Sequence, residues 1–222
     1  MNFSEEWESV YRVGAHMSVW PWSDLVSFVH RHAKPADGFR RVLEVGCGAG
    51  ANIPFFLKLG VDFYGIDGSP EIVGMLHKSF PQLRDNIVLG DFTQSLPFAG
   101  QFDLVVDRAS IPHNTTAAIQ RTFWMIGNQL RPGGKFIGID WFSTAYPDSQ
   151  WGVALDSHTR ASMPQGQFVG LGAVHFSDKQ HILDLLHEAG FQVERLSHKT
   201  VETAIPAGAT TAGWWSFSAV KP

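Results

Sequence analysis

The stretch that most constrains the fold of this chain runs from Arg41 to Asn52 and reads Arg-Val-Leu-Glu-Val-Gly-Cys-Gly-Ala-Gly-Ala-Asn. Its first half is apolar and rich in β-branched residues, which predicts a short buried strand. Three alternating glycines follow, which can turn at positive φ and leave no side chain between the main chain and a ligand. Asn52 to Leu59 then predicts a helix with Asn52 as its cap. Strand, glycine turn and helix N-terminus together predict a cradle for a polar ligand.

Two kinds of cofactor fit such a cradle, and a tight turn without any ligand is the remaining alternative. Gly46, Gly48 and Ala51 satisfy the dinucleotide spacing G-x-G-x-x-G/A, so a dinucleotide is compatible with the glycines. Glu44 favours S-adenosylmethionine, because a carboxylate repels a pyrophosphate and attracts a cationic amino group and a sulfonium. Asp67, about 20 residues further on at the end of a second predicted strand, can accept hydrogen bonds from the ribose hydroxyls of either cofactor.

Further motifs follow the later predicted strands. Gly90-Asp91-Phe92 comes after the third strand, and Leu-Arg-Pro-Gly-Gly-Lys-Phe at 130–136 leads into the fifth. Together with the stretch from Glu44 to Gly50, these motifs resemble class I S-adenosylmethionine-dependent methyltransferases, in the same order and at similar spacing. The Asp107-Arg108-Ala109 step after the fourth strand is similar to a motif of small-molecule methyltransferases of the thiopurine type.

The resemblance implies a Rossmann-like, doubly wound α/β fold. Its mostly parallel, seven-stranded sheet is expected to end in a C-terminal antiparallel hairpin and to carry an N-terminal helical cap. The length of 222 residues suits one domain. Within 1–222 we expect a helical cap at 1–35, a cofactor-binding core at 41–140, a substrate-side insertion at 141–176, and a C-terminal helix and hairpin at 177–222.

The resemblance also implies a cofactor site at the strand ends. A carboxylate at Asp91 can accept a hydrogen bond from the exocyclic amine of adenine, and the Phe92 ring can cover one side of the base. A capped strand end without ligand contact is the alternative for this pair. The cofactor-binding residues implied are Glu44, Gly46, Cys47, Gly48, Asp67, Gly68, Asp91, Phe92 and Asp107.

The acceptor side is expected to come from the N-terminal segment and the aromatic-rich insertion. In the family that the chain resembles, an N-terminal helical segment often covers the active site, so Tyr11, His16 and Trp20 are candidates for a lid over the acceptor. The alternative is that these three side chains pack against the edge of the sheet. An insertion of this length in a compact domain is usually functional.

Arg108 and His113 follow the fourth strand, whose end is expected to face the transferring methyl group, and they are the candidate catalytic residues. Arg108 can anchor an anionic or carbonyl-bearing acceptor through its forked donors. His113 has an ordinary pKa of about 6.5, which suits a proton acceptor at neutral pH. In the structural alternative, Arg108 pairs with Asp107 or another acid and His113 caps the following helix.

The composition limits the kinds of binding partner and the cellular location that we expect for this protein. The 17 basic and 21 acidic residues give a net charge of −4, which argues against a nucleic-acid-binding protein. No apolar run approaches the roughly 20 residues of a membrane span, and no leader signal is visible. The single cysteine carries no disulfide signature, so we expect a cytoplasmic protein, as a monomer or homodimer. The ten histidines are scattered, and no metal site is expected.

These features together predict an S-adenosylmethionine-dependent methyltransferase that acts on an O, N or S atom of a small-molecule acceptor. Two alternatives from other classes are a nucleotide-binding oxidoreductase and a non-catalytic protein that binds S-adenosylmethionine. The sequence does not name the acceptor.

Overall fold

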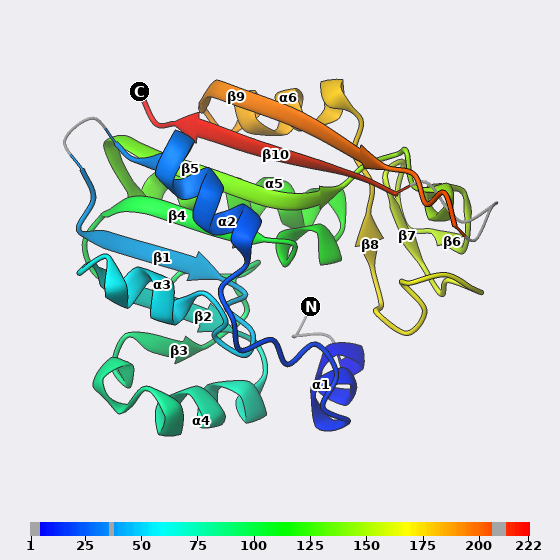
Figure 1. The fold of residues 1–222 in the computed structure, drawn as a ribbon. Helices are drawn as coiled ribbons and strands as arrows, with labels where there is room; N and C mark the ends of the chain where they lie inside the picture. Colours follow the sequence, from blue (N-terminus) through cyan, green and yellow to red (C-terminus); the bar gives the residue numbers. More distant parts are fainter. Residues whose placement is uncertain (1–4, 36–37, 206–211) are drawn as a thin grey trace.

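The computed structural model describes residues 5–35, 38–205 and 212–222, and its centre is one seven-stranded sheet (Figure 1). The strand order is β3-β2-β1-β4-β5-β10-β9. The first five strands run parallel, whereas β10 is antiparallel to both β5 and β9. This confirms the predicted sheet and its C-terminal hairpin. The bounds are Arg41–Val45 (β1), Asp62–Asp67 (β2), Ile87–Leu89 (β3), Phe102–Arg108 (β4), Leu130–Phe142 (β5), Gln192–Val201 (β9) and Ala212–Val220 (β10).

Helices cover both faces of the sheet. The α2, α3 and α4 helices share one apolar core with Val42, Leu104 and Val106, while α5 and α6 share the other with Leu43 and Val105. This division follows from the strand geometry, because successive side chains point to opposite faces. The bounds are Ser23–Phe28 (α2), continued by a π-helical turn at Val29–Ala33 (η1), then Ile53–Lys58 (α3), Pro70–Ser79 (α4), Thr116–Gln129 (α5) and Lys179–Glu188 (α6).

The N-terminal helix and the insertion lie at the same end of the molecule, beyond the arrowheads of the parallel strands (Figure 1). The N-terminal helix α1 spans Glu5–Arg12. The insertion forms a small sheet of β6 (Val153–Ala154), β7 (Thr159–Ala161) and β8 (Val174–His175). Trp7 of α1 packs on a cluster built from the insertion and the end of β5. The two segments therefore form a common wall above the sheet edge.

Short 3-10 turns complete the chain at Pro81–Leu83 (η2), Ile111–His113 (η3) and Pro147–Gln150 (η4). Two helices have side-chain caps, since Ser69 Oγ accepts from the Ile72 amide at 3.1 Å and Asp178 Oδ1 accepts from the His181 amide at 2.9 Å. Among the described helices, we find none with both the length and the apolarity needed to cross a bilayer.

Candidate active site

Three glycines shape the turn after β1, and at only one of them would a Cβ atom be free of close contacts. Gly46, Gly48 and Gly50 have φ angles of 64°, 48° and 79°. A Cβ atom at Gly46 would overlap Ser110 Cβ, and one at Gly50 would lie 2.6 Å from Leu76 Cδ2. A Cβ atom at Gly48 would meet nothing closer than the Tyr11 hydroxyl at 3.6 Å. Packing within the protein therefore explains two of the glycines, whereas Gly48 opens onto a cavity.

Asp67 at the end of β2 holds this turn in place. Its carboxylate accepts hydrogen bonds from the Gly48 amide at 2.9 Å and the Ser69 amide at 3.0 Å. The side chain is 4% exposed, and burial raises its pKa. Cys47, also on the cavity wall, is a buried free thiol whose pKa burial raises well above its ordinary value. This thiol is therefore protonated at neutral pH.

Glu44 carries the least satisfied charge of the turn. Its side chain is 3% exposed, its Oε1 accepts from Asn52 Nδ2 at 2.6 Å, and its Oε2 has no hydrogen-bond partner among the described residues. Burial raises the Glu44 pKa to about 8, against the opposing effect of the Asn52 hydrogen bond. A buried, half-paired carboxylate is costly, which marks this atom as a place where a ligand donor or cation fits.

Asn52 does not cap α3 as the sequence predicts. It stands at the N-cap position without a side-chain capping bond. Its amide instead donates to Glu44, and its Oδ1 accepts from the Trp22 amide at 3.2 Å. The reason is burial, since an enclosed carboxylate gains more from a donor than a helix terminus does.

Asp91 and Phe92 line the cavity beside the glycine turn, as does Gly68. Asp91 Oδ1 accepts from the Thr93 amide at 2.9 Å and the Thr93 hydroxyl at 2.6 Å, which orients the carboxylate. The Phe92 ring comes within 3.4 Å of the position of a Cβ atom on Gly46. Both predicted adenine-side residues are therefore brought to the same edge as Glu44.

Asp107 is placed differently from the other predicted cofactor residues. It is fully buried, and its Oδ1 accepts from the amides of Ser110 and Ile111 at 3.0 Å and from the Ser110 hydroxyl at 2.5 Å. Burial raises its pKa to about 6. Asp107 does not line the cavity. Its carboxylate is engaged in supporting the loop after β4.

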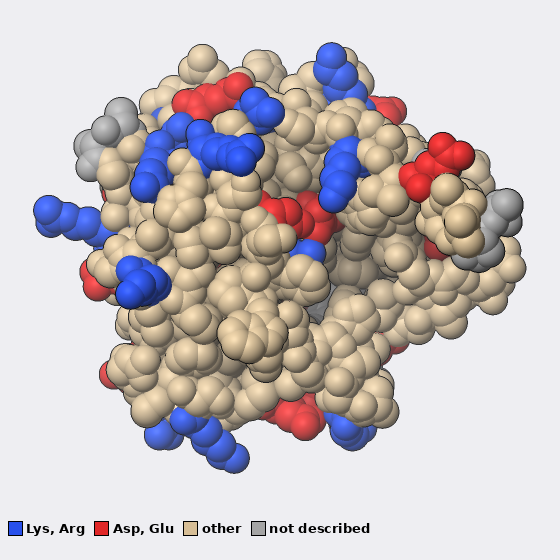
Figure 2. Space-filling model, viewed as in Figure 1, with Lys and Arg blue, Asp and Glu red and all other residues tan. Residues whose placement is uncertain are grey.

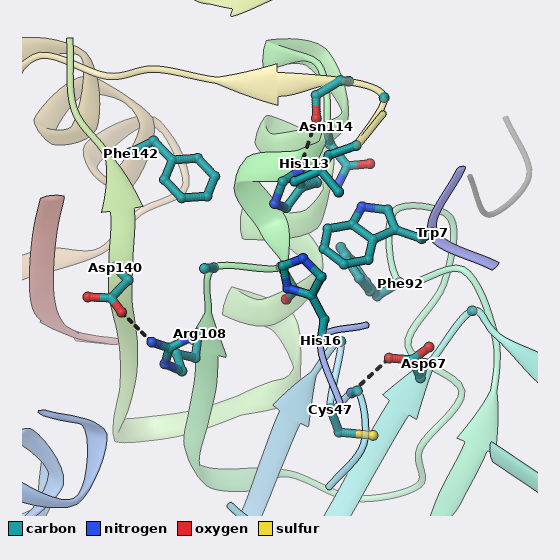
Figure 3. A pocket seen from close by; sticks show the side chains of 18 of the residues that line it. Trp7, His16, Cys47, Asp67, Phe92, Arg108, His113, Asn114, Asp140 and Phe142 are labelled. Atoms are coloured by element: carbon teal, nitrogen blue, oxygen red, sulfur yellow. Dashed lines mark hydrogen bonds and ion pairs between the residues drawn. The ribbon is translucent and has the colours of Figure 1, made fainter. Parts of the chain in front are cut away.

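Arg108 turns to two other acids rather than to Asp107. Its Nη2 lies 2.5 Å from Asp140 Oδ2 (Figure 3). The same atom lies 3.9 Å from Asp24 Oδ2, and the guanidinium stacks 3.6 Å from the centre of the Trp22 ring. Asp140 lies near the end of β5 with a left-handed φ of 57°. Burial raises the Asp140 pKa to about 6, although Arg108 lowers it. The pairing agrees with the structural alternative for Arg108.

His113 faces the cavity with a defined tautomer. Its Nδ1 lies 3.2 Å from the Ala173 carbonyl oxygen, which can only accept, so Nδ1 carries the proton and Nε2 is left as an acceptor. The ring packs edge-on against Trp7 and Phe142, with centroids 4.8 and 5.3 Å apart. Burial lowers its pKa to about 4. The side chain thus contacts the insertion instead of capping α5.

Two of the three predicted lid residues lie on the cavity wall. Tyr11 points at the glycine turn. Its pKa is raised chiefly by burial and also by the negative charge of Asp67. His16 packs against Trp7 at 5.4 Å, close to His113 (Figure 3). Trp20 is 79% exposed and lies outside the wall. Trp22 takes its place, because the Asn52 bond to its backbone turns this residue inward.

These residues surround one cavity of about 1220 Å³, visible as the hollow in Figure 2. It exceeds the roughly 300–1,000 Å³ of a single small-molecule site, so it has room for two ligands side by side. The glycine turn forms one half, and α1, the end of β5 and the insertion form the other. No group of three or more metal-ligating side chains is found within the described ranges. The aromatic insertion that the sequence predicts on the acceptor side contributes Phe142, Tyr146 and Phe168, and further wall residues that the sequence does not single out include Trp7, Trp22, Asp24, Asp140 and Trp214.

Comparisons with known proteins agree with this geometry. Residues 42–134 match the family model described as a methyltransferase domain. A solved S-adenosylmethionine-dependent methyltransferase from Methanosarcina mazei has a TM-score of 0.65 at 18% identity, over 87% of this chain and 96% of that one. The glycopeptide N-methyltransferase MtfA with sinefungin has a TM-score of 0.64 at 18% identity, over 94% and 89%.

A curated relative, ribosomal RNA small subunit methyltransferase A of Porphyromonas gingivalis, is 34% identical over 83 residues. The match covers 35% of this chain and 31% of the relative. The chain therefore spans about a third of that relative's length.

Residues 42–134 thus match a methyltransferase domain, and the chain shares its fold with solved S-adenosylmethionine-dependent methyltransferases. These comparisons agree with the family resemblance that the sequence predicts, and the fold that it implies is confirmed. The glycopeptide N-methyltransferase has been solved with sinefungin and with S-adenosylmethionine.

Proposed function

We propose that this chain transfers the methyl group of S-adenosylmethionine to a small-molecule acceptor. The observation that carries the proposal is the unpartnered Oε2 atom of Glu44, which is buried on the cavity wall beside the open Gly48 turn and has no partner among the described residues. A bound cation stabilises the ionised form of this buried carboxyl group, whereas a pyrophosphate beside it disfavours ionisation. The site therefore favours a sulfonium cofactor over a dinucleotide, and an oxidoreductase is the weaker candidate.

The residues of the glycine-turn half fit the parts of this cofactor. Glu44 would hold its cationic amino-acid end, and Asp67, already oriented by two backbone amides, would accept from the ribose. Asp91 would accept from the adenine amine, and Phe92 would cover the ring. S-adenosylmethionine supplies a methyl group that its sulfonium activates for displacement.

The protein's own contribution is chiefly to hold the acceptor in position, an effect worth at most about 7–11 kcal/mol. His113 would take a proton from the acceptor at Nε2, the nitrogen that the Ala173 bond leaves free. Arg108 would shape the acceptor half by fixing Asp140 through Nη2, while its buried Nε has no hydrogen-bond partner among the described residues. Tyr11 and His16 would close the cavity from the N-terminal side.

An RNA acceptor is the competing proposal, because the relative from Porphyromonas gingivalis is a ribosomal RNA methyltransferase. The net charge of −4 and the aromatic, acid-rich wall speak for a small molecule instead. A cytoplasmic location and a monomeric or homodimeric state stay predictions of the sequence.

Calorimetric titration of the purified protein tests the proposal. S-adenosylmethionine and S-adenosylhomocysteine are expected to bind with one-site isotherms, and NADH is expected not to bind. Slow release of S-adenosylhomocysteine during incubation with a mixed metabolite extract would then separate an enzyme from a non-catalytic binder. Binding of NADH without binding of S-adenosylmethionine would overturn the proposal.

A further inference from the structure

The acceptor half of the cavity contains a buried hydroxyl that the protein does not fully satisfy. Tyr146, which follows β5, is 3% exposed and lies on the cavity wall. Its hydroxyl makes no hydrogen bond of ordinary geometry within the described part of the chain. Burial raises the Tyr146 pKa to about 12; the Asp140 carboxylate adds to the rise, and the nearby Gln167 side chain opposes it. A buried hydroxyl is normally paired, so this atom indicates a polar group on the bound molecule.

Near this hydroxyl, two carboxylates face the same guanidinium. Asp140 and Asp24 lie 2.5 and 3.9 Å from Nη2 of Arg108, and the charge of Lys199 also lowers the Asp140 pKa. Asp140 is 22% exposed and Asp24 41% exposed, and the carboxylates interact with each other as well. A second cation placed between them would balance the remaining negative charge.

The same imbalance holds across the whole wall. Six carboxylate side chains and three basic side chains line the cavity among the described residues. Figure 2 shows acidic and basic atoms together in the hollow. The excess lies in the cofactor half, at Glu44, Asp67 and Asp91, where it suits a positively charged cofactor, so Asp24 and Asp140 are the acids that bear on the acceptor. The acids are Glu6, Asp24, Glu44, Asp67, Asp91 and Asp140, and the bases are Arg108, Arg121 and Lys199.

The rest of this half is aromatic. The ring centroids of Phe142 and Phe168 lie 4.7 Å apart, and those of Tyr146 and Trp214 lie 5.5 Å apart. Trp7 of α1 packs against the same cluster. Such walls suit a flat apolar skeleton, and their ring faces also attract cations.

We infer that the acceptor is an organic amine on a flat apolar skeleton, and that its ammonium group lies between Asp24, Asp140 and the Tyr146 hydroxyl. The inference rests on the proposed function, because it concerns the second substrate of the same cavity. An ammonium offers three donors, and it meets two carboxylates and one hydroxyl oxygen that can accept. A carboxylate on the acceptor would meet two acids, and a neutral hydroxyl would leave their charge unbalanced.

Three indole probes with one skeleton test the inference: tryptamine, its alcohol tryptophol, and indole-3-acetate. The protein is first titrated with S-adenosylhomocysteine, and the probes are then titrated into that complex. Tryptamine is expected to bind about ten-fold or more tightly than tryptophol, with indole-3-acetate weakest. Failure to bind S-adenosylhomocysteine would contradict the proposed function, whereas its binding without an amine preference would contradict only this inference.

Variants assign the preference to the named residues. Asp140→Asn keeps a residue type that tolerates the left-handed backbone, and it should reduce the amine preference to within about three-fold. Asp24→Asn changes a more exposed residue and should also reduce the amine preference. This second variant tests the inference if Asp140→Asn fails to fold. Asp103→Asn is the matched control, because Asp103 pairs with Arg131 at the opposite end of β4. An amine preference that survives both site variants would overturn the inference.

Discussion

Gly48 and Gly60 share a left-handed backbone, with φ angles of 48° and 71°, but differ in their surroundings. A Cβ atom at Gly60, after α3, would meet nothing within 4 Å, whereas Gly48 faces the cavity. Replacing either by alanine should cost about 1–2 kcal/mol of stability through backbone strain. Only Gly48→Ala should weaken S-adenosylmethionine binding, by about ten-fold or more, because the methyl group fills ligand space. Equal calorimetric affinities of the two variants for S-adenosylmethionine would contradict the placement of this cofactor beside Gly48.

Glu44 gives a prediction about pH. Its pKa in the folded protein is raised from an ordinary 4.5 to about 8, so ionisation of this carboxylate destabilises the fold increasingly as pH rises through that window. Glu44→Gln keeps an oxygen for Asn52 and removes the charge. The variant should gain stability over the wild type by on the order of 2 kcal/mol at pH 8.5 and little at pH 5.

Urea denaturation at the two pH values measures this difference, and S-adenosylmethionine affinity should fall in the same variant because the cation loses its partner. A stability difference that does not change between pH 5 and pH 8.5 would mean that Glu44 is not held in a destabilised charged state.

At the scale of elements, Asp156 of the insertion fixes the start of α5. Its carboxylate accepts from the amide and hydroxyl of Thr116 at 2.9 Å and from the amides of His158 and Thr159 at 2.9 and 2.8 Å. Burial raises its pKa, but these hydrogen bonds outweigh burial and hold it well below the ordinary range. The resulting stabilisation is present above about pH 4 and is lost as the carboxylate is protonated at lower pH.

This contact also positions His113, which lies just before α5 and bonds to Ala173 of the insertion. Asp156→Ala should cost about 1–2 kcal/mol of stability and also lower the rate of methyl transfer. Asp178→Ala removes a cap of similar kind from α6, which does not line the cavity, and should lower stability alone. Thermal unfolding measures the stability of both variants, and initial rates of methyl transfer show whether only Asp156→Ala is slower. Matching losses of rate in both would show that the insertion does not position His113.

At the scale of the whole molecule, local patterns predict the sheet and the cofactor half of the cavity well. Glu44, Gly48 and Asp67 are found at strand ends, where one short stretch of sequence specifies both the strand and the turn. The acceptor half depends on tertiary contacts, and Arg108 meets Asp140 and Asp24 from distant positions in the chain. Patterns over a few neighbouring residues in the sequence do not predict ion pairs between such distant positions.

Two further differences have the same origin. Trp20 and Trp22 look alike in sequence, and Trp22 faces the cavity through contacts with the distant residues Asn52 and Arg108. The insertion's strands β6 and β8 are two residues long, too short for an alternating pattern to be recognised.

A crystal structure of the complex with S-adenosylhomocysteine tests the central claim most directly. The expected result places its amino group against Glu44, its ribose against Asp67 and its adenine beside Phe92. The sulfur atom should then face the half of the cavity that Asp140 and Tyr146 line. A ligand bound outside this cavity, or one whose sulfur faces away from that half, would contradict the proposed function.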